Sequence, residues 1–273
     1  MIKKARLDRL GGYHAYKALW CAKFRYSAPV IGLTKQQLFK IQKCIISPSL
    51  AAAGFSSKMP RAIVFGPQKF GGMQWDSPYG ILLVEQIKLV IGSLRIEDTV
   101  GKLVKMQLQW IQVAIGISTP LFEVTKLIHY TPKCWLQQLH EKLVDINVQI
   151  QINKPWKPKI RRKNDQVIMD YVTRQLPKKS WSAINQCRLY LKAMVFSDIT
   201  TFDGEYVPDS VYKVEAPYRS SRIFFPVQKR PTKKSRQEWQ YFIRYITDKN
   251  GKLNVALGGW TRSPYQHFPW VLV

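Results

Sequence analysis

The chain has 273 residues, of which 46% are hydrophobic and 12% aromatic, which excludes an intrinsically disordered protein and predicts one large core or two modest ones. Forty-three Lys and Arg residues stand against 17 Asp and Glu residues, so the net charge is +26. Such a charge calls for an acidic partner, and DNA or RNA comes first because each phosphate contact releases condensed counterions.

Two helices are expected at the start of the chain. Aromatic and apolar residues recur at helical spacing over residues 13–26. Thr34 and Gln37 have the spacing of a capping box, which predicts a second helix directly after them. That helix should run towards Gly54, a residue type common just beyond helix ends, with a kink or break at Pro48.

Glycine and proline then interrupt the chain between residues 55 and 75, around a short β-branched run at residues 62–65. We expect a structured loop there, with a short strand. Ser77 and Pro78 fit the N-cap and the first position of a third helix that reaches about Leu94.

The middle of the chain should contain two more helices and a strand. Asp98 or Thr99 can cap a fourth helix, and a fifth should open at Thr131 and run to about residue 144. The apolar residues of the fourth helix are Leu103, Met106, Trp110 and Val113. The segment VDINVQIQI at residues 144–152 alternates polar and apolar residues, which predicts a strand.

A basic segment that contains prolines follows, KPWKPKIRRKND at residues 154–165, and it predicts a domain boundary. Beyond it, residues 164–175 and 180–199 have helical patterns. Asp203-Gly204 is a turn signal that could close a small β-hairpin. Ser235 and Glu238 form a capping box before a last short helix.

Known catalytic and metal-binding motifs are missing. Two-metal polymerase and nuclease sites need clustered carboxylates, but the acidic residues here are scarce and scattered. Asp198 and Asp203 could form a metal pair, yet an Asp-Gly step after a helix is a common structural turn, which we favour. The four cysteines, Cys21, Cys44, Cys134 and Cys187, contain no Cys-x-x-Cys pair, so we expect reduced thiols rather than a zinc site.

Basic residues are interleaved with aromatic ones at several places. These are Trp156 between Lys154 and Lys157, Arg61 before Phe65, Lys69 beside Phe70, and Arg219 and Arg222 between Tyr218 and Phe225. Exposed rings can stack on bases while Lys and Arg follow the phosphate backbone. The alternative is a solvated basic linker with buried rings. For Trp156 both remain open, whereas Trp20 and Trp110 lie in helical patterns and should pack in a core.

Membrane insertion and secretion are not expected. The most apolar helical stretch, residues 80–94, is interrupted by Glu85 and Lys88, so we expect no membrane span. The first ten residues, MIKKARLDRL, lack the uninterrupted apolar stretch and the cleavage site of a secretory signal. We therefore expect an intracellular protein of the nucleus or the cytoplasm.

Several short motifs follow one another in an order that is known from one family. They are Ile41-Gln42, Gly54-Phe55, Pro60-Arg61-Ala62, Phe65-Gly66-Pro67 and Gly71-Gly72. Further motifs are Glu85-Gln86, SLRIEDTVGKLVKMQLQW, NDQVIMD, INQCRLYLKAMVFSDITTFDG and LGGW. Over nearly its whole length the chain resembles the region that follows the palm in non-LTR-type retroelement reverse transcriptases of diatoms, fungi and other microbial eukaryotes. It departs from the family pattern at Gln74-Trp75.

The resemblance implies nucleic-acid binding without polymerase chemistry. In the family the fingers and the palm, with the Tyr-x-Asp-Asp metal site, lie upstream of this region, and Met1 falls after them. We therefore expect no catalytic residue, metal or cofactor in this chain, since Mg²⁺ would belong to the palm. The thumb of reverse transcriptases is a helical bundle that grips the template-primer duplex. The expected partners are RNA, an RNA/DNA hybrid or DNA, together with the upstream palm.

The combined prediction is a mainly α protein, in which a thumb-like helical bundle is followed by a helical C-terminal region with a small β-hairpin. Its parts are residues 1–55 (thumb-like), 56–151 (central helical) and 152–273 (basic C-terminal). The residues expected to bind nucleic acid are Lys35, Lys40, Lys43, Arg61, Lys69, Lys154, Trp156, Lys157, Lys159, Arg161, Arg162 and Lys163. Two alternatives remain: a stand-alone basic interaction protein that binds an acidic protein or a membrane surface, and a non-functional remnant of the element.

Overall fold

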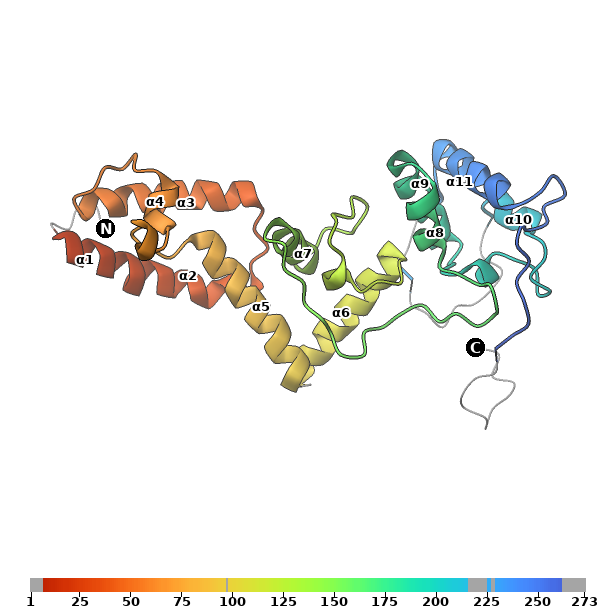
Figure 1. The fold of residues 1–273 in the computed structure, drawn as a ribbon, viewed down its shortest axis with the longest axis horizontal. Coiled ribbons are helices and arrows are strands. Elements are labelled where there is room, and N and C mark those ends of the chain that lie inside the picture. The colour runs from red at the N-terminus through yellow and green to blue at the C-terminus, as the bar shows by residue number, and fades with distance from the viewer. Residues whose placement is uncertain (1–6, 97, 216–224, 227–228, 262–273) are drawn as a thin grey trace. The chain divides into compact units, whose positions relative to one another are not determined.

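The computed structural model describes residues 7–96, 98–215, 225–226 and 229–261. Within these residues the fold is mainly helical, as the sequence predicts (Figure 1). The chain forms two compact units. The N-terminal unit comprises residues 1–105 and 133–145, and the C-terminal unit comprises residues 106–132 and 146–273. These units differ from the three parts expected from the sequence, whose boundaries followed residues 55 and 151.

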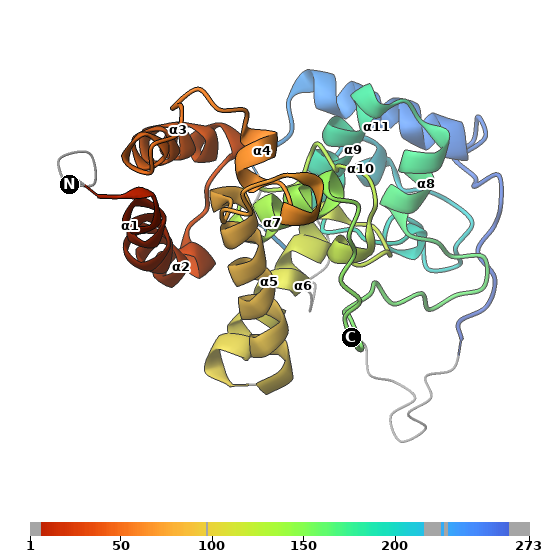
Figure 2. The same cartoon turned by 60° about the vertical axis from the view of Figure 1, so that its left-hand side comes forward.

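The N-terminal unit begins with one long helical run. It consists of α1 (Arg9–His14), a π-helical segment at Ala15–Cys21, α2 (Ala22–Ser27) and a 3-10 turn at Ala28–Val30. The helix expected over residues 13–26 is therefore confirmed. α3 (Lys35–Ala52) lies alongside this run, as two views of the fold show (Figures 1 and 2).

Both ends of α3 lie where local signals in the sequence place them. Gln37 N–H donates to Thr34 Oγ1 at 3.3 Å and Thr34 N–H donates to Gln37 Oε1 at 2.9 Å, so the capping box is confirmed. At the other end Gly54 has a φ of 76°, and Phe55 N–H donates to the Leu50 carbonyl at 2.8 Å. That pattern is typical of a helix that ends at a glycine. Pro48 lies inside α3 and does not end it.

The β-branched run expected to form a strand is a helical turn, α4 (Arg61–Phe65), so the strand prediction is wrong. Met73 N–H donates to the Ile63 carbonyl at 2.8 Å, and Trp75 N–H donates to the Val64 carbonyl at 3.0 Å. The loop after the turn thus forms backbone hydrogen bonds with the carbonyls of Ile63 and Val64, and the Val64 side chain is buried. Over so few residues, these tertiary contacts outweigh the weak β preference of the side chains.

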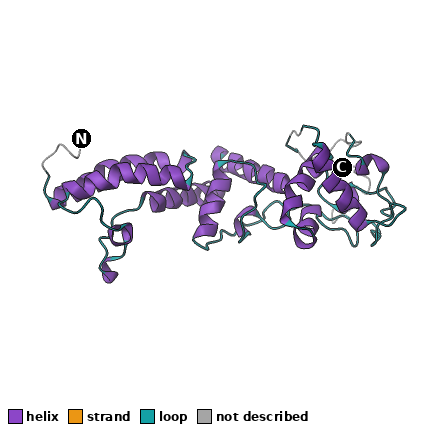
Figure 3. Cartoon of the chain, turned by 90° about the horizontal axis from the view of Figure 1, so that it is seen from above, coloured by secondary structure: helices purple, strands orange, loops and turns teal. Residues whose placement is uncertain are grey.

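The next three helices are α5 (Pro78–Ile96), α6 (Thr99–Ile115) and α7 (Trp135–Asp145). α5 and α6 begin where the sequence predicts, whereas α7 begins at Trp135 and not at Thr131. Asp98 caps α6, because its Oδ1 accepts from Gly101 N–H at 2.6 Å. The strand expected at residues 144–152 is wrong, since these residues end α7, turn and continue as a loop. Figure 3 shows helices and loops but no strand among the residues that it colours. A strand needs a partner along its length, and alternation of side chains does not supply one.

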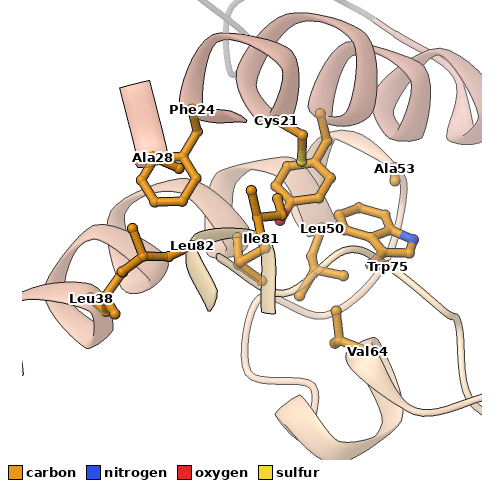
Figure 4. Close-up of a cluster of buried hydrophobic side chains, with 12 residues drawn as sticks. Cys21, Phe24, Ala28, Leu38, Leu50, Ala53, Val64, Trp75, Ile81 and Leu82 are labelled. Carbon is orange, nitrogen blue, oxygen red and sulfur yellow. The ribbon is translucent and has the colours of Figure 1, made fainter. Parts of the chain in front are cut away.

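One core joins the α1–α2 run, α3, α4 and α5 of the N-terminal unit (Figure 4). Aromatic rings stack through it, with ring centroids 5.0 Å apart for Tyr16 and Trp75 and 5.0 Å apart for Trp20 and Phe24. Residues on both sides of position 55 therefore share this core, which is why no boundary follows that position.

The C-terminal unit contains α8 (Ile168–Gln175), α9 (Lys178–Tyr190), α10 (Asp209–Tyr212) and α11 (Lys233–Ile246). α9 packs against both α8 and α11. Residues 164–167 and 191–199, expected to be helical, are not part of α8 and α9. Instead Val167 pairs with Val195 in an antiparallel bridge, and Ile168 N–H donates to the Met194 carbonyl at 3.0 Å. This long-range pairing competes with helix continuation on both sides.

Two local predictions near the C-terminus are corrected. α11 begins after Thr232, whose Oγ1 accepts from Ser235 N–H at 3.2 Å, so the capping box of Ser235 and Glu238 is wrong. The buried face of α11 is nonetheless the expected one, with Trp239 and Phe242 inside. Asp203-Gly204 does form a turn, closed by Thr201 N–H to the Tyr206 carbonyl at 2.8 Å. Tyr206 then pairs with Lys252 in an isolated bridge, and a β-hairpin is not confirmed.

Candidate nucleic-acid interface

Part of the predicted set lies in one row along α3. Lys40 and Lys43 are exposed and three residues apart, so they lie on the same face of the helix. Ser47 follows Lys43 by one turn on that face, and Arg61 Nη2 donates to Ser47 Oγ at 3.0 Å. We call Lys40, Lys43 and Arg61 the α3 row, in which Arg61 is half-buried and bonds the residue one turn beyond Lys43.

The two other predicted cations of the N-terminal unit are placed differently. Lys35 forms an ion pair with Asp145, with Nζ to Oδ2 at 2.9 Å. Both side chains are exposed, so this pair is weak and a phosphate could replace the carboxylate. Lys69 lies in the loop after α4, with its Nζ 4.8 Å from the centroid of the exposed Phe70 ring.

The C-terminal set is organised by an extended pairing of its backbone. Thr261 N–H donates to the Arg161 carbonyl at 2.7 Å, and Gly258 N–H donates to the Lys163 carbonyl at 2.9 Å. In extended backbone successive side chains point to opposite sides. Arg161 and Lys163 are accordingly exposed, whereas Arg162 between them is buried. Lys157 and Lys159 continue the exposed odd-numbered positions. We call Lys157, Lys159, Arg161 and Lys163 the basic strip, and Lys154 is exposed ahead of it.

Two members of the predicted set are less exposed than the cations around them, and one of the two, Arg162, is corrected. Only 5% of Arg162 is exposed, and its guanidinium donates to the carbonyls of Phe202 at 2.9 Å, Asp203 at 2.6 Å and Gly258 at 2.8 Å. Its hydrogen bonds thus join two loops instead of meeting a phosphate. Trp156 is half-buried and packs against the core cluster around Leu189 and Met194. A run of basic residues cannot all face outward in extended backbone, which explains the Arg162 result.

Replacing Arg162 by Met should lower the free energy of unfolding of the C-terminal unit by about 2 kcal/mol, because three partly buried carbonyls lose a charged donor. Replacing its neighbour Lys163 by Met removes the same charge from an exposed position and should change stability by less than about 0.5 kcal/mol. Urea-induced unfolding of both variants measures the difference. Equal stabilities would show that the Arg162 hydrogen bonds contribute nothing.

The carboxylates considered as a metal pair have structural roles. Asp198 Oδ2 accepts from the backbone N–H of Met194 at 2.7 Å and of Val195 at 3.0 Å. Asp203 Oδ1 accepts from Glu205 N–H at 2.9 Å and from the Thr201 hydroxyl. The Thr201 hydroxyl and this amide hold the pKa of Asp203 below its usual range. In the described part of the chain no three His, Cys, Asp or Glu residues come together as metal ligands.

Sequence patterns did not reveal two exposed rings beside the basic strip. Phe202 and Trp260 belong to segments 58 residues apart in the sequence, and their ring centroids lie 5.8 Å apart. The available signals were the Asp-Gly turn that follows Phe202 and the LGGW motif that contains Trp260. Neither signal says that the two rings meet.

Arg219 and Arg222 lie outside the described residues, whereas Phe225, at the end of the same segment, is buried.

Of the helices that are described, none has the length and apolar character needed to cross a membrane. No family model, curated protein or solved structure matches the chain.

Proposed function

We propose that the chain binds nucleic acid, as the thumb and C-terminal part of a non-LTR-type retroelement reverse transcriptase. In this proposal it grips the template-primer duplex and contributes no polymerase chemistry from its own residues. The proposal is supported by one observation above all, the exposed side chains of Lys40, Lys43 and the basic strip in a chain of net charge +26. Any metal chemistry would belong to the palm.

The electrostatics of the α3 row favour phosphate over protein carboxylates. Within the described residues, Lys40 and Lys43 have no carboxylate partner, in contrast to Lys35 and Lys88, which have Asp145 and Glu85. Residues three positions apart on one helix face have Cβ atoms about 5–6 Å apart. The ammonium groups of Lys40 and Lys43 can therefore contact neighbouring phosphates of one strand. Each such contact releases counterions, which is the driving force of binding.

The type of target follows from the kind of contacts that these cations make. Lys and Arg that meet phosphates position a protein on a duplex but do not read its sequence. An A-form duplex, such as RNA or an RNA/DNA hybrid, offers its backbone and 2′-hydroxyls rather than a readable major groove. We therefore infer recognition by charge and shape, without a preferred sequence, of RNA, RNA/DNA or DNA.

Binding to a short RNA/DNA hybrid should weaken steeply as salt is raised from about 50 to 200 mM, with log K linear in log salt. Replacing Lys40 and Lys43 together by Ala should weaken binding to all sequences alike. It should also reduce the salt slope by about one unit per lysine that contacts a phosphate. Fluorescence anisotropy at several salt concentrations measures both quantities.

Lys88→Ala is the matched control, because Lys88 is exposed on α5 of the same unit and paired with Glu85 at 3.1 Å. It should leave the salt slope unchanged. Binding that does not respond to salt, or no binding at low salt, would contradict the proposal. A stoichiometric protein partner that survives nuclease treatment would instead support the interaction protein.

A further inference from the structure

Two large aromatic side chains lie exposed and side by side in the C-terminal unit. Phe202 is 76% exposed and Trp260 is 47% exposed. Their ring centroids are 5.8 Å apart and their planes differ by 34°, a tilted rather than perpendicular arrangement. A pair of this kind presents a continuous apolar surface to solvent, which a folded protein normally covers or uses.

The backbone beneath the two rings is fixed before any ligand arrives. Arg162 donates to the carbonyls of Phe202 and Asp203 on one side and of Gly258 on the other, so one buried guanidinium joins both loops. Its Cζ also lies 4.9 Å from the centroid of the Trp260 ring. A ligand that stacks there would therefore pay little to order the protein.

The turn that carries Phe202 needs a glycine two residues later, at position 204. Gly204 has a φ of 78°, and a Cβ built on it would lie 2.5 Å from Arg162 Nη1. The close approach of the Gly204 backbone lets the guanidinium reach the turn, and it explains why the Asp-Gly step occurs at this place. The same contacts hold Phe202 against the segment of Trp260.

The basic strip lies on the segment that pairs with that of Trp260. Arg162 and Trp260 form the antiparallel bridge between the two segments, so the side chains of Arg161 and Lys163 leave the strip on the side opposite to Arg162. Lys163 N–H donates to the Gly259 carbonyl at 3.2 Å, directly before Trp260. Exposed rings and exposed basic side chains on paired segments are the combination that binds single-stranded nucleic acid, in which bases stack and phosphates meet Lys or Arg.

We propose that Phe202 and Trp260 form a stacking platform for unpaired bases of single-stranded RNA or DNA, whose flanking phosphates reach the basic strip on the segment paired with that of Trp260. The inference rests on the proposed function and deepens it, because it assigns a single-stranded segment next to the gripped duplex to a defined pair of rings. Bases inside a duplex already stack on one another, so they cannot offer their faces. The platform therefore distinguishes single strands from duplexes, which the cations alone do not.

The test compares the affinity of the full chain for a single-stranded oligouridine and for a blunt-ended RNA duplex. Trp260→Leu and Phe202→Leu keep an apolar side chain but remove the ring. Each should weaken single-strand binding roughly 5- to 100-fold, the range expected from base–ring stacking, and leave duplex binding within about twofold. Trp260→Phe keeps a ring and should recover most of the affinity. Tyr241→Leu, which changes an exposed ring of α11 in the same unit, should have no effect on either ligand.

A second measurement does not depend on the folding of variants. Irradiation of the unaltered protein with an oligonucleotide that contains 5-iodouridine should give crosslinks at Trp260 or Phe202, mapped by mass spectrometry. Crosslinks confined to other residues would overturn the platform. So would Leu variants with unchanged single-strand affinity, or with equal losses for single strand and duplex. In those cases salt-dependent duplex binding would leave the proposed function standing, whereas an unaltered protein that binds neither ligand would refute both.

Discussion

Replacing Arg188 by Met should lower the free energy of unfolding of the C-terminal unit by about 3 to 5 kcal/mol. The guanidinium is fully buried and donates to the carbonyls of Val113 at 2.8 Å, Ala114 at 3.1 Å and Ala193 at 3.0 Å. Methionine fills much of the space but donates no hydrogen bond, so buried oxygens lose their partners. Burial lowers the pKa of Arg188 to about 10, which still leaves it protonated at neutral pH.

The location of these carbonyls strengthens the expectation. Val113 and Ala114 lie in the last turn of α6, where backbone carbonyls have no partner within the helix. A cation at a helix C-terminus also interacts favourably with the helix dipole. Gly116 has a φ of 71°, and a Cβ built on it would lie 2.5 Å from Arg188 Cζ. Gly116→Ala should therefore disturb the same contact from the other side.

Lys179→Met is the matched control for Arg188, because it removes one positive charge from an exposed position of the same helix, α9. It should change the free energy of unfolding by less than about 0.5 kcal/mol. Urea-induced unfolding measures the loss, and hydrogen exchange at residues 106–116 and 184–195 locates it. If Arg188→Met is as stable as the control, the buried hydrogen bonds are not what holds α6 to α9.

Replacing Trp75 by Ala should destabilise the N-terminal unit by about 3 to 5 kcal/mol, the usual cost of removing a large buried ring. Trp75 is 5% exposed, and its ring centroid lies 5.0 Å from that of Tyr16 and 5.6 Å from that of Tyr13. The substitution opens a cavity between the loop after α4 and the α1–α2 run. Amides of α1 to α3 should lose protection from hydrogen exchange although none of them belongs to the altered loop.

Phe70→Ala is the control for Trp75, since Phe70 lies in the same loop and is 78% exposed. It should leave the unfolding transition and the exchange of α1 to α3 unchanged. A Trp75→Ala protein in which only residues after 55 lose protection would show that residues 1–55 fold by themselves. That outcome would restore the thumb-like part expected from the sequence.

Interactions within a few residues were predictable from the sequence. The capping box of Thr34 and Gln37, the cap at Asp98 and the glycine end of α3 depend on side chains and backbone at most five residues apart. The buried face of α11 follows from helical period alone. The exposure of Lys40 and Lys43 follows in the same way, because apolar residues occupy the other face of α3.

Long-range pairing decided what local patterns could not. Residues 62–65 and 144–152 have strand-like composition. The first segment is helical through its contacts with a later loop, and the second has no strand to pair with among the described residues. Val167 and Val195 lie outside the helices expected for them because they pair with each other.

The candidate interface divides in the same way. Its charge and the exposure of most lysines depend on composition and local period, which are written in the residues themselves. Whether Arg162 meets phosphate or carbonyl depends on a backbone pairing with residues nearly a hundred positions away, and so does the meeting of Phe202 with Trp260. A local pattern in the sequence does not identify such distant partners, because the burial of a charged group depends on which distant oxygens surround it.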